Sequence, residues 1–211
     1  MTNQTLKNSG SDLNVGIIGA GAIGQAMAKQ LVRAGVNVTL SNSRGPASLA
    51  KIVGQLGAKA RAGTVREAAA ADIVFLSVTW EHLQSAVADL PRWDGRIVID
   101  ATNPVLQPGF RLAELGGRNS SQVLTDMLPG ARLVKAFNTL LAAVLASDPN
   151  QAGGKRVVFL SGDDAAAKAT VAQLIERLGF AGIDLGSLAV GGQLQQFPGG
   201  PLPALNLIKL A

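Results

Sequence analysis

A glycine-rich loop near the start of the 211-residue chain carries its most specific chemistry. The six residues beginning at Gly19 read GAGAIG, which is the spacing G-x-G-x-x-G. Gly19 permits a tight turn, Gly21 lets the backbone approach a pyrophosphate, and Gly24 allows a helix to pack closely on a strand. Ala22 and Ile23 open that helix, whose free N–H groups and dipole favour phosphate. The sequence therefore predicts that these five residues bind a dinucleotide.

The end of the next expected strand indicates which dinucleotide binds. A carboxylate about 20 residues beyond such a loop takes the ribose 2′-hydroxyl of NAD, whereas an Arg accommodates the 2′-phosphate of NADP. Residues 40–46 contain Arg44 but no Asp or Glu. We therefore predict NADP(H), with Ser43 and Arg44 on the 2′-phosphate and Asn42 or Ser41 as a further donor. The alternative is an Arg44 side chain that points into solvent.

Two later strand ends are expected beside the same crevice. Residues 73–78 and 96–101 are typical of successive buried strands, and parallel strands of an open sheet end at one edge. Pro104 restrains the preceding Asn103 toward an extended conformation. We place Val78 and Asn103 near the ribose or nicotinamide of the cofactor, and an ordinary turn at Pro104 is the alternative.

Few side chains are available for acid–base catalysis. The chain has no Tyr or Cys and a single His, which excludes a Tyr-Lys pair, thiolate nucleophiles, disulfides and sites with Cys or several His ligands to a metal. A surface or capping role suits His82 better than a general base. Lys135 and Asn138 are better placed to face the crevice, although Lys135 as a structural cation stays open. We assign no catalytic residue and no metal ligand.

The alternation of strands and helices predicts a Rossmann-type α/β fold, a doubly wound parallel sheet with a small C-terminal extension. We divide the chain into a disordered leader at 1–12, an NADP-binding domain at 13–150 and an α/β extension at 151–211. Within the fold, residues 105–118 lack periodicity and are expected to form a loop. Helix starts are expected at capping pairs of an N-terminal polar residue and a Glu or Gln three positions later, as at Thr64 and Asn119.

The composition limits the partners. Hydrophobic residues make up 47% of the chain and charged residues 16%, which is typical of a globular protein. The net charge of +5 comes from scattered Lys and Arg without a basic run, so we expect no nucleic-acid binding. The longest aliphatic run, residues 140–146, is too short to span a bilayer, and residues 1–12 carry no secretory signal. We expect a cytoplasmic protein without membrane contact.

Several motifs together resemble one family, the NADP oxidoreductases that use the deazaflavin coenzyme F420. The resemblance covers nearly all of residues 14–208. Its elements are the glycine loop, Ser43-Arg44, Asn103-Pro104, Lys135 to Thr139, Arg156 to Asp163, Gly191-Gly192 and Gly199-Gly200-Pro201.

This resemblance implies that hydride passes directly between the nicotinamide C4 and the deazaflavin C5. Such a transfer needs proximity more than a proton-transferring side chain, which suits a chain with one His and no Tyr. The small-molecule redox partner is then F420 or a flavin-like ring. The resemblance also implies that residues 151–211 complete the second-cofactor pocket and form a homodimer contact. The charge-free segment 185–208 fits such a wall or interface, or an ordinary cover of the core.

Alternative functions remain open at this point. One is an NADPH-dependent reductase of small imines or carbonyls, related to pyrroline-carboxylate reductases, although the short segment after Gly179 does not suit their long helical dimerisation domain. Another is an NADPH-binding sensor, which Phe197 or Leu202 blocking the C4 face would favour. Membrane ferric reductases carry a similar domain for electron export, but we expect no such role here, because the sequence shows no transmembrane segment.

Overall fold

A mainly parallel β-sheet runs through the computed structural model, which describes residues 13–210. The expected leader at 1–12 lies outside the described residues. The strands along the sheet are β1 (Asn14–Ile18), β2 (Asn37–Ser41), β3 (Ala60–Ala62), β4 (Ile73–Leu76), β5 (Ile97–Asp100), β8 (Arg132–Ala136), β10 (Gly154–Gly162) and β11 (Ala181–Asp184).

The strand order is β11-β10-β8-β5-β4-β1-β2-β3. The run β3-β2-β1-β4-β5 is parallel throughout and has the order of a dinucleotide-binding fold. Every residue of β4 and β5 is buried, as expected for strands covered on both faces. The structure confirms the predicted Rossmann-type α/β fold.

Helices cover both faces of this sheet. They are α1 (Ala22–Arg33), α2 (Ala50–Leu56), α3 (Val65–Ala69), α4 (Leu83–Val87), α5 (Ser120–Met127), α6 (Ala142–Ala146), α7 (Ala165–Arg177) and α8 (Gly191–Gln195), with single-turn 3₁₀ helices at η1 (Pro46–Leu49) and η2 (Trp80–His82). One apolar cluster packs α1, α6 and α7 against one face of the sheet, and a second packs α3, α4 and α5 against the other. The two faces thus have separate cores.

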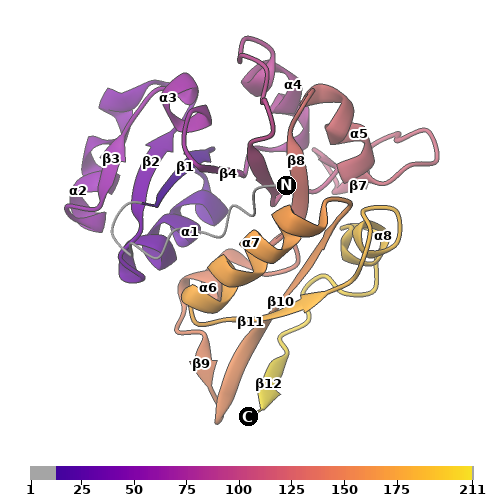
Figure 1. Cartoon of the computed structure of the whole chain (residues 1–211). Helices are drawn as coiled ribbons and strands as arrows, with labels where there is room; N and C mark the ends of the chain where they lie inside the picture. Colours follow the sequence, from indigo (N-terminus) through magenta and orange to yellow (C-terminus); the bar gives the residue numbers. More distant parts are fainter. Residues whose placement is uncertain (1–12, 211) are drawn as a thin grey trace.

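Strand β10 departs from the predicted parallel arrangement. It runs antiparallel to β8, pairing Leu160 with Ala136, and then parallel to β11. Its first residues extend beyond the sheet and pair with the short strands β9 (Asn150–Gln151) and β12 (Ile208–Leu210), as Figure 1 shows at the lower end of the molecule. The sheet therefore continues across residue 150, and the division into 13–150 and 151–211 stays a prediction.

Two local predictions have different outcomes. The expected loop at 105–118 contains a small hairpin of β6 (Val105–Leu106) and β7 (Arg111–Leu112), which propensity did not reveal because each strand has only two residues. The caps at Thr64 and Asn119 are confirmed, each with reciprocal bonds to the residue three positions later.

In the described part of the chain, no helix is long and apolar enough to cross a membrane.

Candidate functional site

The glycine loop turns sharply between β1 and α1. Gly19 has a φ of +109°, and its N–H donates to Ser41 O at 3.1 Å. A Cβ on Gly19 would lie 2.5 Å from Ser77 O, and one on Gly24 would lie 1.9 Å from Gly19 O. Ser77 Oγ also donates to Gly19 O at 2.9 Å. The backbone at these positions therefore has no room for a side chain.

The next part of the loop is open instead. A Cβ on Gly21 would meet no atom within 4 Å, and Gly21 caps α1 in an extended conformation without a side-chain hydrogen bond. Ala22 and Ile23 open this 12-residue helix, whose first turn carries no acidic residue. Uncapped N–H groups at a helix start, with free space before them, fit a pyrophosphate. This geometry is that of a dinucleotide cradle.

The residues after β2 form a turn held by Asn42. Its Oδ1 accepts from Arg44 N at 3.0 Å, and its Nδ2 donates to Ser48 Oγ at 3.0 Å. Ser43 and Arg44 are exposed at the tip. Ser41 is buried and donates to Ile17 O at 2.8 Å, so its suggested role as a phosphate donor is wrong. The turn presents a guanidinium where the 2′-phosphate is expected.

Val78 follows β4, which pairs with β1, and Asn103 follows β5, which pairs with β4 on the other side. A Cβ on Gly19 would lie 3.0 Å from Val78 Cγ1, so this half-buried side chain lies directly against the loop. Asn103 is also half-buried. Its Nδ2 donates to Asn138 O at 2.9 Å, which leaves the second amide hydrogen for a ligand. The loop, Val78 and Asn103 therefore lie on successive strand ends at one edge of the sheet.

Lys135 does not face this edge. It is fully buried, and Nζ donates to Asp100 Oδ2 at 3.1 Å, to Thr102 O at 3.1 Å and to Ser120 Oγ at 3.2 Å. These bonds use all of its ammonium hydrogens, as a buried charge requires. The expectation that Lys135 faces the crevice is wrong, and the structural alternative holds.

His82 is the last residue of η2 and directly precedes α4, and its side chain is exposed. Its Nδ1 forms a hydrogen bond of 2.7 Å with Thr79 Oγ1. This local contact across one turn fits the surface interpretation. Within residues 13–210, no group of three or more His, Asp and Glu side chains gathers as a metal site.

Asn138, which was expected to face the crevice, is buried in a polar cluster whose contacts the sequence reasoning missed. Asn138 Nδ2 donates to Asn103 Oδ1 at 2.9 Å and to Gln195 O at 2.7 Å. Phe197 N donates to the same Asn103 oxygen at 3.2 Å. The fully buried Gln195 also accepts from Ser161 Oγ at 2.7 Å. The sequence had marked Asn103 and Asn138 separately at two strand ends, and the amide pair at 195–196 lies in a segment without charges, but no local pattern joins these residues.

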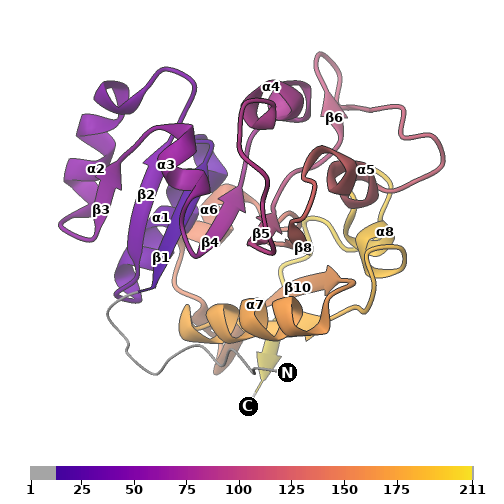
Figure 2. The same ribbon diagram turned by 45° about the horizontal axis from the view of Figure 1, so that its top comes forward.

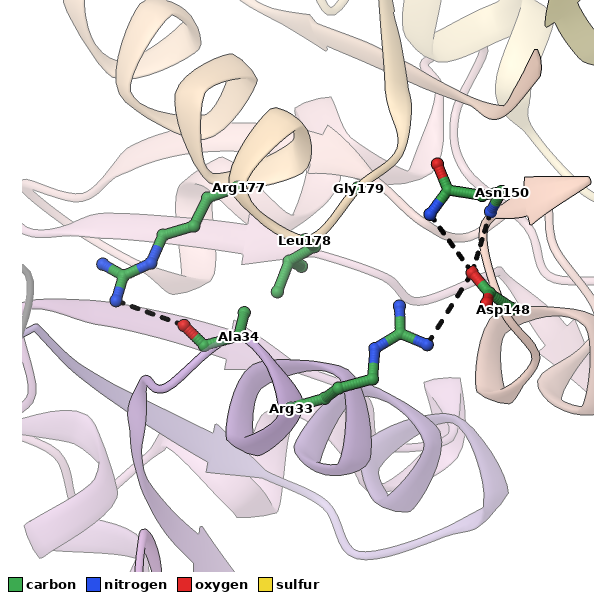
Figure 3. Close-up of a pocket in the computed structure, with 7 residues that line it drawn as sticks. All are labelled: Arg33, Ala34, Asp148, Asn150, Arg177, Leu178 and Gly179. Atoms are coloured by element: carbon green, nitrogen blue, oxygen red, sulfur yellow. Dashed lines mark hydrogen bonds and ion pairs between the residues drawn. The ribbon is translucent and has the colours of Figure 1, made fainter. Parts of the chain in front are cut away.

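A separate hollow of about 320 Å³ opens at the far end of α1 (Figure 3). Arg33 lies there 4.0 Å from Asp148, and Arg177 donates to Ala34 O at 3.3 Å. Arg33 stands 11 residues along α1 from Ala22, about 17 Å at the rise of an α-helix. The hollow is thus remote from the glycine loop.

Comparison with known proteins identifies the family. Residues 14–104, which include the glycine loop, the Arg44 turn and Asn103, match the family described as NADP oxidoreductase, coenzyme F420-dependent. The matched segment, residues 14–104, therefore belongs to this family. The family is one of NADP-dependent oxidoreductases, which confirms the enzyme class and the NADP(H) cofactor expected from the glycine loop and Arg44. The contacts of individual residues with the cofactor stay predictions.

Two mammalian metalloreductases are similar in sequence to this chain. Metalloreductase STEAP3 of Rattus norvegicus is 30% identical over 197 residues, covering 93% of this chain and 38% of that protein. Metalloreductase STEAP2 of Homo sapiens is 28% identical over 194 residues, covering 88% of this chain and 36% of that protein. The chain therefore spans under two fifths of the length of these relatives.

Solved structures match over a larger share of their length. A hypothetical protein from Sinorhizobium meliloti has 47% identity and a TM-score of 0.89, covering 94% of this chain and 96% of its own. A candidate F420-dependent NADP reductase from Arthrobacter sp. FB24 has 26% identity and a TM-score of 0.68, covering 84% and 86%. A reductive aminase from Aspergillus terreus in complex with NADPH and ethyl levulinate, at 21% identity, a TM-score of 0.62 and coverage of 85% and 56%, shares the fold.

Proposed function

We propose that the protein is an NADPH-dependent oxidoreductase whose hydride partner is a planar ring, either the deazaflavin coenzyme F420 or a flavin. The proposal rests on one observation: the start of α1 at Gly21 is open and uncapped, and the turn after β2 exposes Arg44. When bound, NADPH would supply a hydride from C4 to the acceptor ring and become NADP⁺. The reduced ring would take up one proton from water.

Different residues at this edge of the sheet bind different parts of NADPH. The N–H groups at Ala22 and Ile23 receive the pyrophosphate, and Ser43 and Arg44 receive the 2′-phosphate. Each charge-assisted hydrogen bond of this kind contributes about 1.5–3 kcal/mol. Val78 and Asn103 lie farther along the edge, so we assign them to the ribose and nicotinamide.

The C-terminal extension at 151–211 is proposed to complete the acceptor pocket and the contact of a homodimer. Several large apolar side chains of its charge-free segment are exposed; they are Val190, Leu194, Phe197, Leu205 and Leu207. Aromatic and aliphatic groups of this kind pack against planar rings or against a second subunit. The cytoplasmic location stays a prediction.

The proposal is tested by NADPH oxidation with separate acceptors: a deazaflavin, FMN and a panel of imines, with NADH as the matched donor. We expect turnover with the deazaflavin or FMN and a preference for NADPH. Turnover with imines alone would favour the reductase of small imines. Binding of NADPH without turnover on any acceptor would favour a sensor.

A second candidate function is electron supply to a metal, which the 30% identity to a metalloreductase across 93% of the chain favours. NADPH gives up two electrons as hydride, whereas a ferric ion accepts one, so a flavin must lie between them. The assay therefore includes a ferric chelate with and without FMN. Ferric reduction that depends on FMN supports this candidate.

A further inference from the structure

Asn138 joins segments that are far apart in the sequence. Its side chain is buried just after β8, where Nδ2 donates to Asn103 Oδ1 at 2.9 Å and to Gln195 O at 2.7 Å. In return, Asn138 O accepts from Asn103 Nδ2 at 2.9 Å, and Asn138 Oδ1 accepts from Gln195 Nε2 at 3.3 Å. Asn138 thus bonds reciprocally with both the end of β5 and the end of α8.

The backbone before Asn138 is strained. Phe137 has a φ of +66°, a left-handed conformation that bulky residues rarely adopt. Its ring is fully buried and makes edge contacts with Phe75 and Phe180, with ring centres 5.9 and 6.2 Å away. The core therefore holds Phe137 in place while the chain leaves the strand direction at that point. Conformations of this kind persist where the surroundings fix them, often next to functional groups.

The other partner, Gln195, is equally constrained. It is fully buried, with Nε2 donating to Phe159 O at 3.2 Å and Oε1 accepting from Ser161 Oγ at 2.7 Å. Two residues later, Phe197 N donates to Asn103 Oδ1 at 3.2 Å, and the Phe197 side chain is 38% exposed. The C-terminal segment is thereby fixed against Asn103 and presents an aromatic side chain beside it.

We propose that Asn138 is a positioning residue for hydride transfer. Asn138 bonds to Asn103, on the nicotinamide side, and to the segment that ends at Phe197, on the acceptor side. It therefore holds the distance between these two sides constant. The proposal rests on the proposed function, because it assigns those two sides to NADPH and to a planar acceptor. Hydride transfer depends steeply on alignment, and a displacement of about 1 Å can lower the rate by about 100-fold.

A neighbouring anchor provides a matched control. Asn119 Nδ2 donates to Leu188 O, so it holds the same C-terminal segment, but the hydrogen bonds of Asn103 run to Asn138 and Phe197 and not to Asn119. Asn119 Oδ1 also caps α5 by accepting from Gln122 N at 3.0 Å. Asn119→Ser keeps an oxygen for the cap and removes the bond to Leu188. It therefore loosens the segment without touching the proposed positioning contacts.

The first measurement compares the dissociation constants of NADPH and of 2′,5′-ADP, which lacks the nicotinamide half, by calorimetry. For Asn138→Ala we expect 2′,5′-ADP binding within about twofold of wild type and NADPH binding weakened by about 5- to 10-fold, a change of about 1 kcal/mol. Asn119→Ser should leave both constants near wild type. An equal loss for both ligands in Asn138→Ala would show a general structural defect and overturn the proposal.

The second measurement is turnover with a deazaflavin, using NADPH and NADPH deuterated at C4. Asn138→Ala should lower kcat by about 10- to 100-fold, change the acceptor KM less, and raise the deuterium isotope effect because hydride transfer becomes slower than other steps. Wild-type kcat in Asn138→Ala would overturn the proposal. Asn138→Ser, which keeps a polar group but is too short to bond Asn103 as before, replaces Asn138→Ala if that variant does not fold.

The two measurements separate this proposal from the proposed function. If wild-type protein reduces neither a deazaflavin nor FMN, the proposed function fails. The binding comparison then still decides whether Asn138 positions the nicotinamide end. A selective loss of NADPH affinity supports that role, and an unchanged NADPH constant contradicts it.

Discussion

The residues of the glycine loop are glycines for different physical reasons. At Gly19 and Gly24 the surrounding backbone excludes a side chain, whereas at Gly21 the space beyond the backbone is open. The sequence spacing predicted this division, because the motif itself separates a turn, a ligand approach and a packing position. The role of Ser41 could not be predicted, since its hydroxyl turns inward to Ile17 O rather than toward the turn.

Substitutions at Gly21 and Gly24 should therefore have different effects. Gly21→Ala places a methyl group in the open cradle, so we expect wild-type stability and NADPH binding weakened at least about tenfold. Gly24→Ala places its Cβ 1.9 Å from Gly19 O and should lower the unfolding temperature as well. Calorimetric titration and thermal unfolding of both variants test this difference. Equal stability losses in the two variants would contradict the geometry.

The Arg44 side chain should set the choice of cofactor. Arg44→Ala removes a charge-assisted contact to the 2′-phosphate, so we expect NADPH affinity to fall by about 10- to 100-fold while NADH affinity barely changes. The control is Arg33→Ala, another exposed Arg, at the end of α1 remote from the glycine loop. The assignment is wrong if Arg44→Ala weakens both cofactors to the same extent.

At the scale of elements, local signals predicted helix starts better than strand directions. Thr64 and Asn119 specify their caps through residues three positions away, so a short stretch of sequence contains the whole interaction. The antiparallel direction of β10 depends instead on its pairing with β8, which is distant in the chain. The sequence shows one sign of the buried pair, because Asp100 and Lys135 each stand near the end of an apolar strand. Their pairing became clear only from the register of the structure, which places them opposite each other.

The start of α7 should respond to pH. Arg132 donates to both carboxylate oxygens of Asp164 and, with the N–H of Ala167, lowers the pKa of Asp164 from 3.8 to about 2. Because the folded-state pKa is lowered, this contribution to stability is present above pH 3.8 and is lost as pH falls toward 2. The side chain is 42% exposed, so solvent weakens the ion pair.

Two variants separate the ion pair from the helix cap. Asp164→Ala should lower the free energy of unfolding at neutral pH by about 1 kcal/mol, whereas Asp164→Asn keeps a capping oxygen and should cost less. Urea denaturation at several pH values measures both effects. If wild type and Asp164→Asn lost stability in parallel between pH 3.8 and about 2, the Asp164 carboxylate would not be the group responsible.

At the scale of the whole molecule, one sheet carries both sides of the proposed site. The parallel run from β3 to β5 holds the glycine loop and the Arg44 turn, and β10, which runs antiparallel to β8, supports α8. Figures 1 and 2 both place α8 beside α5, where Ser120 N donates to Gln196 Oε1 at 2.9 Å. The Rossmann-type α/β fold followed from the alternation of elements. The attachment of the C-terminal segment did not, because it depends on buried amides that have no periodic pattern.

The central claim is direct hydride transfer from NADPH to a planar acceptor, and the most direct measurement follows the transferred hydrogen. NADPH with both C4 hydrogens replaced by deuterium is mixed with the protein and a deazaflavin, and the reduced deazaflavin is analysed by mass spectrometry and NMR. We predict deuterium at C5 of the deazaflavin, with no exchange into water. Reduction without label at C5, or no reduction of the deazaflavin at all, would contradict it.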